Sequence, residues 1–205
     1  TTVDHSGHYA PKPIEIQLFP SSLRVLFFKA MAAAAGDERV DGVMPLIRER
    51  LPVLNELTDK TFAGTSVVGI DLASLAGFDG LKSVDGDHAD LRGLTAGKTV
   101  INRTLAKKLE AEIGDDITLV APSGRGVYRV IDIVEDKGLA GGDEEIRSAA
   151  LFSVETLQGV LGREGQYNMI EVSVTGGLRV DEDDSDDLAE DLQLVFINDE
   201  AANTL

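Results

Sequence analysis

The chain has 205 residues, of which 43% are hydrophobic, and a formal net charge of −17 from 36 acidic and 19 basic residues. This length and apolar content suit one large domain or two small ones, and no apolar run approaches the roughly 18 residues that cross a bilayer. So large a negative charge repels phosphate backbones and anionic lipid headgroups, which argues against nucleic acid as a partner.

Two explanations of the acidity stay open. One is a site for cations or basic partners, and the other is a hydrated surface adapted to high salt. We favour high-salt (halophilic) adaptation because the acidic residues are spread from Asp4 to Glu200; a site would concentrate them. The chain has no cysteine, which excludes disulfides, zinc thiolates and cysteine nucleophiles. Two of its three histidines, His5 and His8, lie in the N-terminal segment, and we expect no metal site and no cofactor.

The N-terminal segment predicts a strand followed by a helix. It begins with Thr and lacks a basic stretch followed by an apolar one, so we expect a fragment of a longer protein, without a signal peptide. Alternating apolar residues predict a strand over 14–18. Ser21 and Ser22 predict the start of a helix over 23–35, which Gly36 ends.

Prolines divide the next stretch into short predicted strands. A strand over 40–44 is expected to stop at Pro45. A second strand, over 50–55, is expected at a sheet edge because Pro52 has no N–H to donate.

After a third predicted strand over 66–71, the segment 72–97 is rich in glycine and aspartate, and we expect irregular surface with short helical turns. A strand over 99–101 and a helix over 104–113 follow. Asn102 is expected to cap this helix, with Leu105, Leu109 and Ile113 on its buried stripe.

The remaining patterns predict a hairpin and several short elements. They are a strand over 117–120, a turn over 122–126, a strand over 127–134, a loop over 137–145, a strand over 149–152, a helix over 154–161, a strand over 169–174, an acidic loop over 181–187 and a helix over 186–195. Helices and strands mix without strict alternation, which predicts an α+β fold.

Two acidic motifs resemble known metal sites only in part. Residues 141–145 look like the signature of diguanylate cyclases, but Glu145 stands where that motif has an aromatic residue. Residues 181–187 look like the start of a calcium loop, but Asp186 and Leu192 stand where that loop needs Gly and Glu. We interpret both as solvated loops.

No catalytic constellation is recognisable. Asp115 and Asp116 occupy a predicted turn, where aspartates cap and bend the chain. Val68 to Asp71 lacks the further glycines of a phosphate loop, and no Gly-x-Ser-x-Gly motif is present. His88 lies in an aspartate-rich loop without the local signature of a catalytic triad. We therefore expect no catalytic residue and no enzymatic activity.

The order of the central elements resembles the periplasmic core domain of MacB-like permeases, of the FtsX/MacB type of ABC transporter. The segments that carry the resemblance are Lys98–Leu109, Ile113–Leu119, Val127–Asp136 and Gly138-Leu139. Val67–Asp71 resembles the strand that leads into this region, Leu151-Phe152 with the helix containing Gln158 resembles the part that leaves it, and Asn168–Val174 resembles the returning strand. The resemblance covers about 40–177.

The resemblance implies two subdomains. Residues 1–71 plus 162–205 would form a membrane-proximal, porter-like split α/β subdomain, and residues 72–161 an inserted, sabre-like mixed α+β subdomain. It further implies membrane helices on both sides and a location on the extracytoplasmic face of the cell membrane. No catalytic residue is implied here. The implied partners are a cytoplasmic ABC ATPase, a second permease copy and an extracellular accessory protein.

Two other functions compete with this one. An independent secreted module that binds a solute or a cation would need a ligand-lined pocket. A hydrolase would need a nucleophile, a base and oxyanion donors brought together from distant segments. The sequence supports the hydrolase least.

Overall fold

A computed structural model describes residues 14–17, 31–32, 34–36, 40–75, 81–141 and 148–174 of the chain. The chain divides into two compact units. Unit 1 comprises Thr1–Pro45, Ser74–Phe78 and Asn168–Leu205, and unit 2 comprises Leu46–Ala73 and Asp79–Tyr167. Strands and helices are mixed in the chain, which confirms the predicted α+β class. The predicted subdomain boundaries after residues 71 and 161 stay a prediction.

In unit 1, strand β1 (Ile14–Gln17) pairs antiparallel with β8 (Met169–Val174). Both strands were predicted from alternating apolar residues, and Ile170 and Val172 of β8 are buried. The described residues among 31–35 are helical, and the Gly36 N–H donates to the carbonyl of Ala32 at 3.1 Å. The rest of the helix predicted over 23–35 lies outside the described residues, as do the loop over 181–187 and the helix over 186–195.

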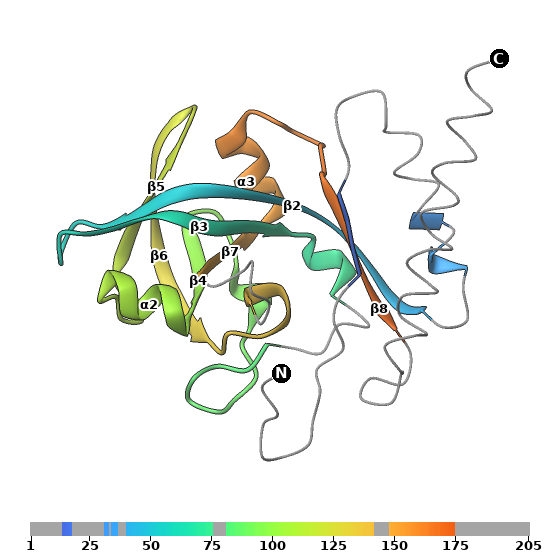
Figure 1. Cartoon of the computed structure of the whole chain (residues 1–205), viewed down its shortest axis with the longest axis horizontal. Helices are drawn as coiled ribbons and strands as arrows, with labels where there is room; N and C mark the ends of the chain where they lie inside the picture. Colours follow the sequence, from blue (N-terminus) through green and yellow to red (C-terminus); the bar gives the residue numbers. More distant parts are fainter. Residues whose placement is uncertain are drawn as a thin grey trace. The chain divides into compact units, whose positions relative to one another are not determined.

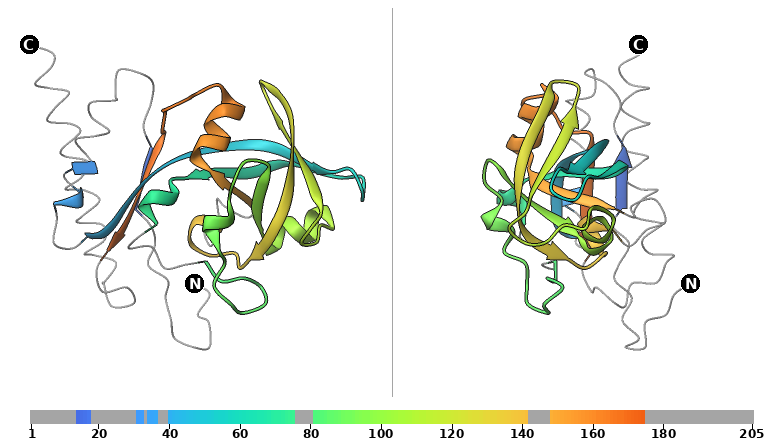
Figure 2. Two further views of the ribbon diagram at one scale, coloured as in Figure 1. Left: turned by 180° about the vertical axis from the view of Figure 1, so that it is seen from behind. Right: turned by 90° about the vertical axis from the view of Figure 1, so that its left-hand side faces the viewer.

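Unit 2 is built on strands that close into a ring (Figures 1 and 2). The strands are β2 (Val40–Asn55, which begins in unit 1), β3 (Lys60–Ile70), β4 (Lys98–Asn102), β5 (Asp116–Ala121), β6 (Gly124–Val134) and β7 (Ala149–Ser153). They are hydrogen-bonded in the order β2-β3-β7-β4-β6-β5. Strand β5 then pairs with β2, with Val53 opposite Leu119 and Leu54 opposite Thr118. This last pairing makes the sheet a closed, six-stranded barrel.

The core of unit 2 combines the inner face of this barrel with two helices. These are α2 (Arg103–Leu109) and α3 (Val154–Leu161), and both pack on β3. Leu105 and Leu157 of these helices are fully buried in the same cluster as Phe152 of β7. The Tyr128 and Phe152 rings meet edge to face, with centroids 4.9 Å apart. Side chains of the two helices thus complete the hydrophobic core that the strands of the barrel begin.

Strand β2 is continuous, so the prediction of two strands separated at Pro45 was wrong. The pairing of β2 with β3 begins at Leu46, directly after Pro45. The register of the same pairing shifts between Leu51 and Val53, at Pro52. A proline at an irregularity in the ladder removes no regular strand hydrogen bond. Both prolines are therefore compatible with a single long strand. The predicted edge position of 50–55 was also wrong, because Val53 and Leu54 pair with both β3 and β5.

Helix α2 is shorter than predicted, because it ends at Leu109 and not at Ile113. Glu110 adopts a left-handed conformation (φ +50°), and its N–H donates to the carbonyls of Ala106 and Lys107. The predicted burial of Ile113 was accordingly wrong, since its side chain is 50% exposed. The sequence has no glycine at this position to signal the helix end.

Most of the other predicted elements are present, but two bounds were wrong. Strand β3 begins at Lys60, six residues before the predicted start at 66, and β6 begins at Gly124, so the turn predicted over 122–126 consists of Pro122 and Ser123 only. The helix over 154–161 and the strand over 169–174 have the predicted bounds, and the strands over 99–101, 117–120 and 149–152 are present with one or two additional residues. The irregular segment after β3 contains two short 3-10 turns, η2 (Leu72–Ser74) and η3 (Leu91–Gly93), and η4 (Gly138–Ala140) follows β6. Among the helices described, none has the length and apolar character needed to cross a bilayer.

Candidate interaction surface

The turn aspartates singled out in the sequence have structural partners. The Asp115 carboxylate accepts the Glu112 N–H at 2.9 Å, as a turn-capping aspartate does. Asp116 pairs with Arg129 of β6, with 2.6 Å between Oδ1 and Nε. This contact raises the pKa of Arg129, mainly through the hydrogen bond. Within the described ranges, no group of three or more Asp, Glu or His side chains could hold a metal ion.

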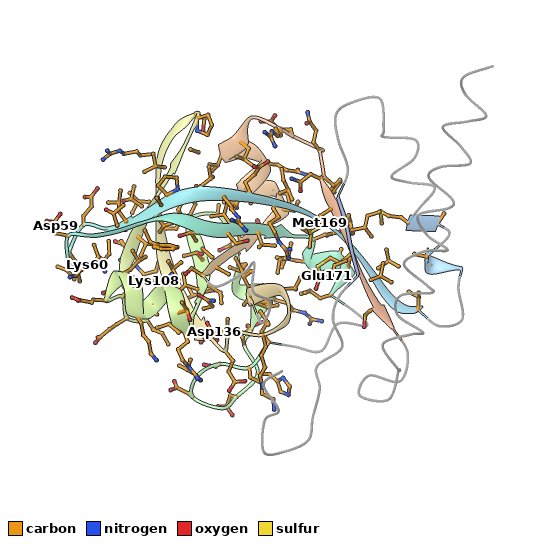
Figure 3. All side chains as sticks on the ribbon, viewed as in Figure 1. Asp59, Lys60, Lys108, Asp136, Met169 and Glu171 are labelled. Carbon is orange, nitrogen blue, oxygen red and sulfur yellow. The ribbon has the colours of Figure 1, made fainter. Side chains whose placement is uncertain are left out.

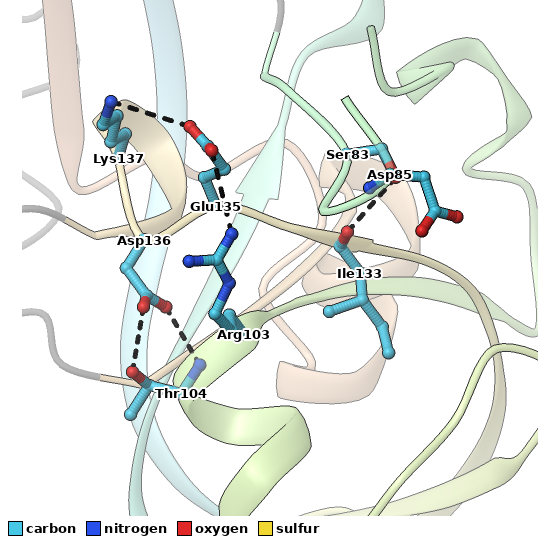
Figure 4. Close-up of polar contacts among 8 residues, drawn as sticks. All are labelled: Ser83, Asp85, Arg103, Thr104, Ile133, Glu135, Asp136 and Lys137. Atoms are coloured by element: carbon cyan, nitrogen blue, oxygen red, sulfur yellow. Dashed lines mark hydrogen bonds and ion pairs between the residues drawn. The ribbon is translucent and has the colours of Figure 1, made fainter. Parts of the chain in front are cut away.

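The loop that contains His88 is attached to β6 (Figure 4). The Ser83 hydroxyl donates to the Asp132 carboxylate at 2.8 Å, and the Val84 N–H donates to the Ile133 carbonyl at 2.8 Å. His88 itself is exposed, and its backbone bridges to Lys82. The predicted diguanylate-cyclase-like segment begins at Gly141, and its other residues lie outside the described part of the chain.

A buried asparagine joins three segments of unit 2. The Asn102 side-chain oxygen accepts the N–H of Leu105 at 2.9 Å, which confirms the predicted cap of α2. The same oxygen accepts the N–H of Ala149 at 3.0 Å, and the amide nitrogen donates to the Ala140 carbonyl at 2.9 Å. One side chain therefore fixes the starts of α2 and β7 and the end of η4.

A second side chain, the carboxylate of Asp136, also caps the start of α2 (Figure 4). The Asp136 carboxylate accepts hydrogen bonds from the Thr104 N–H and the Thr104 hydroxyl, both at 3.0 Å. Glu135 forms ion pairs with Arg103 at 3.7 Å and with Lys137 at 3.6 Å. The charged side chains here are paired with one another and with the first turn of α2, so their role is structural.

The turn between β2 and β3 is fixed to the end of α2. The Thr58 hydroxyl donates to the Leu109 carbonyl at 2.6 Å, and the Asn55 amide donates to the same carbonyl at 3.3 Å. The Asn55 oxygen in turn accepts the Leu57 N–H at 3.0 Å. Lys60 pairs with Glu110 at 3.3 Å. Figure 3 shows Lys60 at the far end of the β2–β3 hairpin, which is thereby held in one conformation.

Three exposed apolar side chains lie around this turn. The exposed fractions are 80% for Leu57, 61% for Val127 and 50% for Ile113. Val127 of β6 lies opposite Thr118 of β5. Thr118 in turn lies opposite Leu54 of β2, and Leu57 follows three residues after Leu54. With about 4.8 Å between strands and about 3.3 Å per residue, the Cα atoms of Leu57 and Val127 are at most roughly 20 Å apart.

Ile113 is connected to the same region by its neighbour. The Gly114 N–H donates to the Val130 carbonyl of β6 at 2.8 Å, three residues from Val127. We call Leu57, Ile113 and Val127 the apolar tip. In the part of the chain that the structure describes, Val84, at 36%, is the other large apolar side chain classed as exposed. Most of the exposed apolar character of this part therefore gathers at the apolar tip.

Residues 8–193 match the family model of the MacB-like periplasmic core domain. The chain belongs to this family. The match covers most of the chain and confirms the resemblance that the sequence motifs indicated. No curated protein is similar enough to this MacB-like domain to count as a relative.

Two solved structures share the fold of this MacB-like domain. The periplasmic region of MacB from Actinobacillus actinomycetemcomitans is 14% identical, with a TM-score of 0.52 over 87% of this chain and 74% of that one. The extracellular domain of the noncanonic ABC-type transporter YknZ from Gram-positive bacteria is 15% identical, with a TM-score of 0.51 over 80% of this chain and 84% of that one. Both are extracytoplasmic parts of membrane transporters.

Sequence reasoning did not identify the apolar tip of this MacB-like domain. Leu57 belongs to a short polar stretch that carries no pattern, and Ile113 was assigned to a buried stripe. Val127 could have been found, because it precedes the buried Tyr128 and so must point to the other face of β6. Its exposure depends on what covers that outer face, which the local sequence does not encode.

Proposed function

We propose that this MacB-like domain is the extracytoplasmic part of an ABC-transporter permease. It is carried by membrane segments of the parent permease, moves in response to a cytoplasmic ATPase and contacts other proteins outside the membrane. Membership in the family is the observation that supports this proposal most strongly. The domain performs no chemistry of its own in this proposal; its task is mechanical.

The build of unit 2 supports a mechanical task. A domain that transmits displacement must keep its shape under load, and closure of the barrel pairs each of its strands on both sides. Contacts between distant segments add to this rigidity. The Ser123 hydroxyl in the β5–β6 turn donates to the Val160 carbonyl of α3, and Arg163 after α3 pairs with Glu49 of β2. Unit 2 is therefore suited to move as one body.

These 205 residues contain no cysteine, so labels can be placed at chosen positions of this domain once any cysteines in the rest of the permease have been replaced. Exposed Lys98 and Glu164, both in unit 2, can be replaced singly by Cys and labelled with a fluorescent donor in the parent permease. The permease is reconstituted with its ATPase in vesicles whose lipid headgroups carry an acceptor. We expect energy transfer from each donor to the bilayer to differ between the nucleotide-free and the ATP-bound states.

Two controls define the result. A doubly labelled Lys98→Cys/Glu164→Cys variant should show a constant distance within unit 2 in both states. A hydrolysis-deficient ATPase should hold the energy transfer at one value during incubation with ATP. Transfer that stays constant while the wild-type ATPase turns over would refute transmission of motion to this domain.

A further inference from the structure

We infer that the apolar tip is a docking site for a protein whose contact surface is apolar at its centre and basic around it, and that it does not bind a second copy of this chain. This inference rests on the proposed function, which requires contacts outside the membrane. It adds where such a contact is made and which chemistry is recognised.

The first argument is the cost of leaving Leu57 in water. Turns are normally formed by small polar residues, and the neighbours of Leu57 (Glu56, Thr58 and Asp59) follow this rule. Burying apolar surface is favourable by about 25 cal/mol per Å², so an exposed leucine at a protruding turn gains stability when a partner covers it. Val127 and Ile113 add to the same gain.

The second argument is that the turn is already ordered. The bonds of Asn55 and Thr58 to the Leu109 carbonyl fix the backbone on both sides of Leu57. Binding to a fixed turn avoids most of the entropy that a flexible loop loses on association. The estimated spacing within the apolar tip also fits a standard interface of about 800 Å² per partner. The turn that carries Leu57 is thus already ordered before a partner binds.

The third argument is the charge that surrounds the apolar tip. Segments 54–61, 109–118 and 125–129 contain six acidic and three basic residues, a local net charge of −3. Lys60 and Arg129 are already paired with Glu110 and Asp116. The exposed acidic residues Glu56, Asp59 and Glu112 form no ion pair with any described residue. Arg125 is exposed and likewise forms no ion pair with a described residue, so these three acidic groups and one basic group are left for a partner, a net charge of −2.

This charge selects the class of partner. A second copy of the chain carries the same −17 and would place acidic residues against acidic residues. A basic surface would instead be attracted, with a range of about 8 Å at physiological ionic strength. The apolar centre and the acidic surroundings together favour a different, basic protein over self-association.

Binding can be tested on the 205-residue chain with two synthetic helical peptides. Both carry the same leucine face, and one has lysine and the other glutamate at all polar positions. We expect the lysine peptide to shift NMR signals of residues 54–60, 110–115 and 125–129 and to bind at least about tenfold more tightly than the glutamate peptide. Equal binding of the two peptides, or shifts confined to other regions, would overturn the inference.

Variants separate the apolar and the charged contributions. Leu57→Asp should weaken binding of the lysine peptide by about tenfold or more, whereas Val84→Asp, at the other exposed apolar position, should leave it unchanged. Glu56→Lys/Glu112→Lys should reverse the preference between the peptides. Equal effects of Leu57→Asp and Val84→Asp would contradict the assignment of the site.

The oligomeric state provides the remaining outcome. Sedimentation of the chain at millimolar concentration should show a monomer, and a dimer that Leu57→Asp dissociates would overturn the inference in favour of self-association. These measurements need neither membrane nor ATPase. Their failure is thus distinguishable from failure of the proposed function, which depends on energy transfer in vesicles.

Discussion

Asn102 donates its side-chain N–H to the carbonyl of Ala140, 38 residues further along the chain, and its oxygen serves the N–H groups of Leu105 and Ala149. All three bonds are buried. Asn102→Ala leaves these backbone groups unsatisfied, and we expect the free energy of unfolding to fall by about 3 kcal/mol. Urea denaturation followed by circular dichroism measures this change.

The helix α3 offers a matched control for this prediction. Ser153 caps it through one backbone bond, to the Thr156 N–H at 3.3 Å. Ser153→Ala should therefore cost only about 1 kcal/mol. Equal costs for the two caps would show that the bonds of Asn102 to Ala140 and Ala149 contribute nothing.

Gly69 permits the close approach of α3 to β3. A Cβ atom there would lie 2.8 Å from Ile47 Cγ2, 3.0 Å from Leu157 Cβ and 3.2 Å from Val154 Cα. Because two of these atoms belong to the α3 backbone or its first side-chain carbon, the helix would have to move. We expect Gly69→Ala to lower the free energy of unfolding by about 2 kcal/mol, measured as above.

Gly159→Ala is the corresponding control. A Cβ at this exposed position in α3 would meet nothing within 4 Å, so the substitution should raise the free energy of unfolding by about 0.5 kcal/mol through helix propensity. If Gly69→Ala is as harmless as Gly159→Ala, the contact between α3 and β3 is looser than described.

Alkaline pH should destabilise the domain through Tyr128. Burial raises the pKa of this phenol above its ordinary value of 10.0. The folded state then holds the proton more tightly than the unfolded chain, so stability is full below the ordinary pKa and falls as the pH rises above it. Tyr128→Phe removes this loss.

The measurement is the urea midpoint of the wild type and of Tyr128→Phe at about pH 8 and about pH 11. The variant should lose less stability over this interval. Some loss should remain in the variant because of Tyr167. Burial and, to a lesser extent, the charges of Asp71 and Glu155 also raise the pKa of this second tyrosine. Parallel losses in wild type and variant would show that Tyr128 ionises equally easily in both states.

Salt should stabilise the chain if its acidity is an adaptation to high salt. Screening shortens the range of repulsion among charges from about 10 Å at 0.1 M to about 3 Å at 1 M salt. We expect the melting temperature to rise by about 4 °C over this range, equivalent to about 1 kcal/mol. Differential scanning calorimetry in sodium and potassium chloride measures it.

The competing explanation, a cation site, predicts a different curve. Binding to one site saturates and depends on the identity of the cation, whereas screening continues into the molar range. If the acidity is an adaptation to high salt, neutralising exposed acids by Glu56→Gln/Glu112→Gln/Glu164→Gln should reduce the salt dependence. Saturation at millimolar concentration of one divalent ion would instead indicate a cation site.

Local patterns predicted most of the described helices and strands. Helix α3, strand β8 and the Asn102 cap follow from periodicity and capping within a few residues, and the structure has each of them. The motifs also indicated the family. These signals suffice because each depends on neighbours in the sequence.

The errors concern features set by distant contacts. Pro52 is tolerated because the pairing of β2 with β3 is irregular there, and closure of the barrel depends on Val53 meeting Leu119. The end of α2 at Glu110 depends on a left-handed residue other than glycine. None of these can be derived from a window of adjacent residues.

Closure of the barrel by β5 and β2 has a consequence for recognition. Where the ring is closed, its strands are paired on both sides. A row of unpaired N–H and C=O groups, which an extended peptide needs for strand addition, is left only where a strand extends beyond its neighbour, as β3 does over Lys60–Thr65 before its pairing with β7 begins at Ser66. Over the closed part of the barrel, selectivity must then come from side chains presented on turns and outer faces.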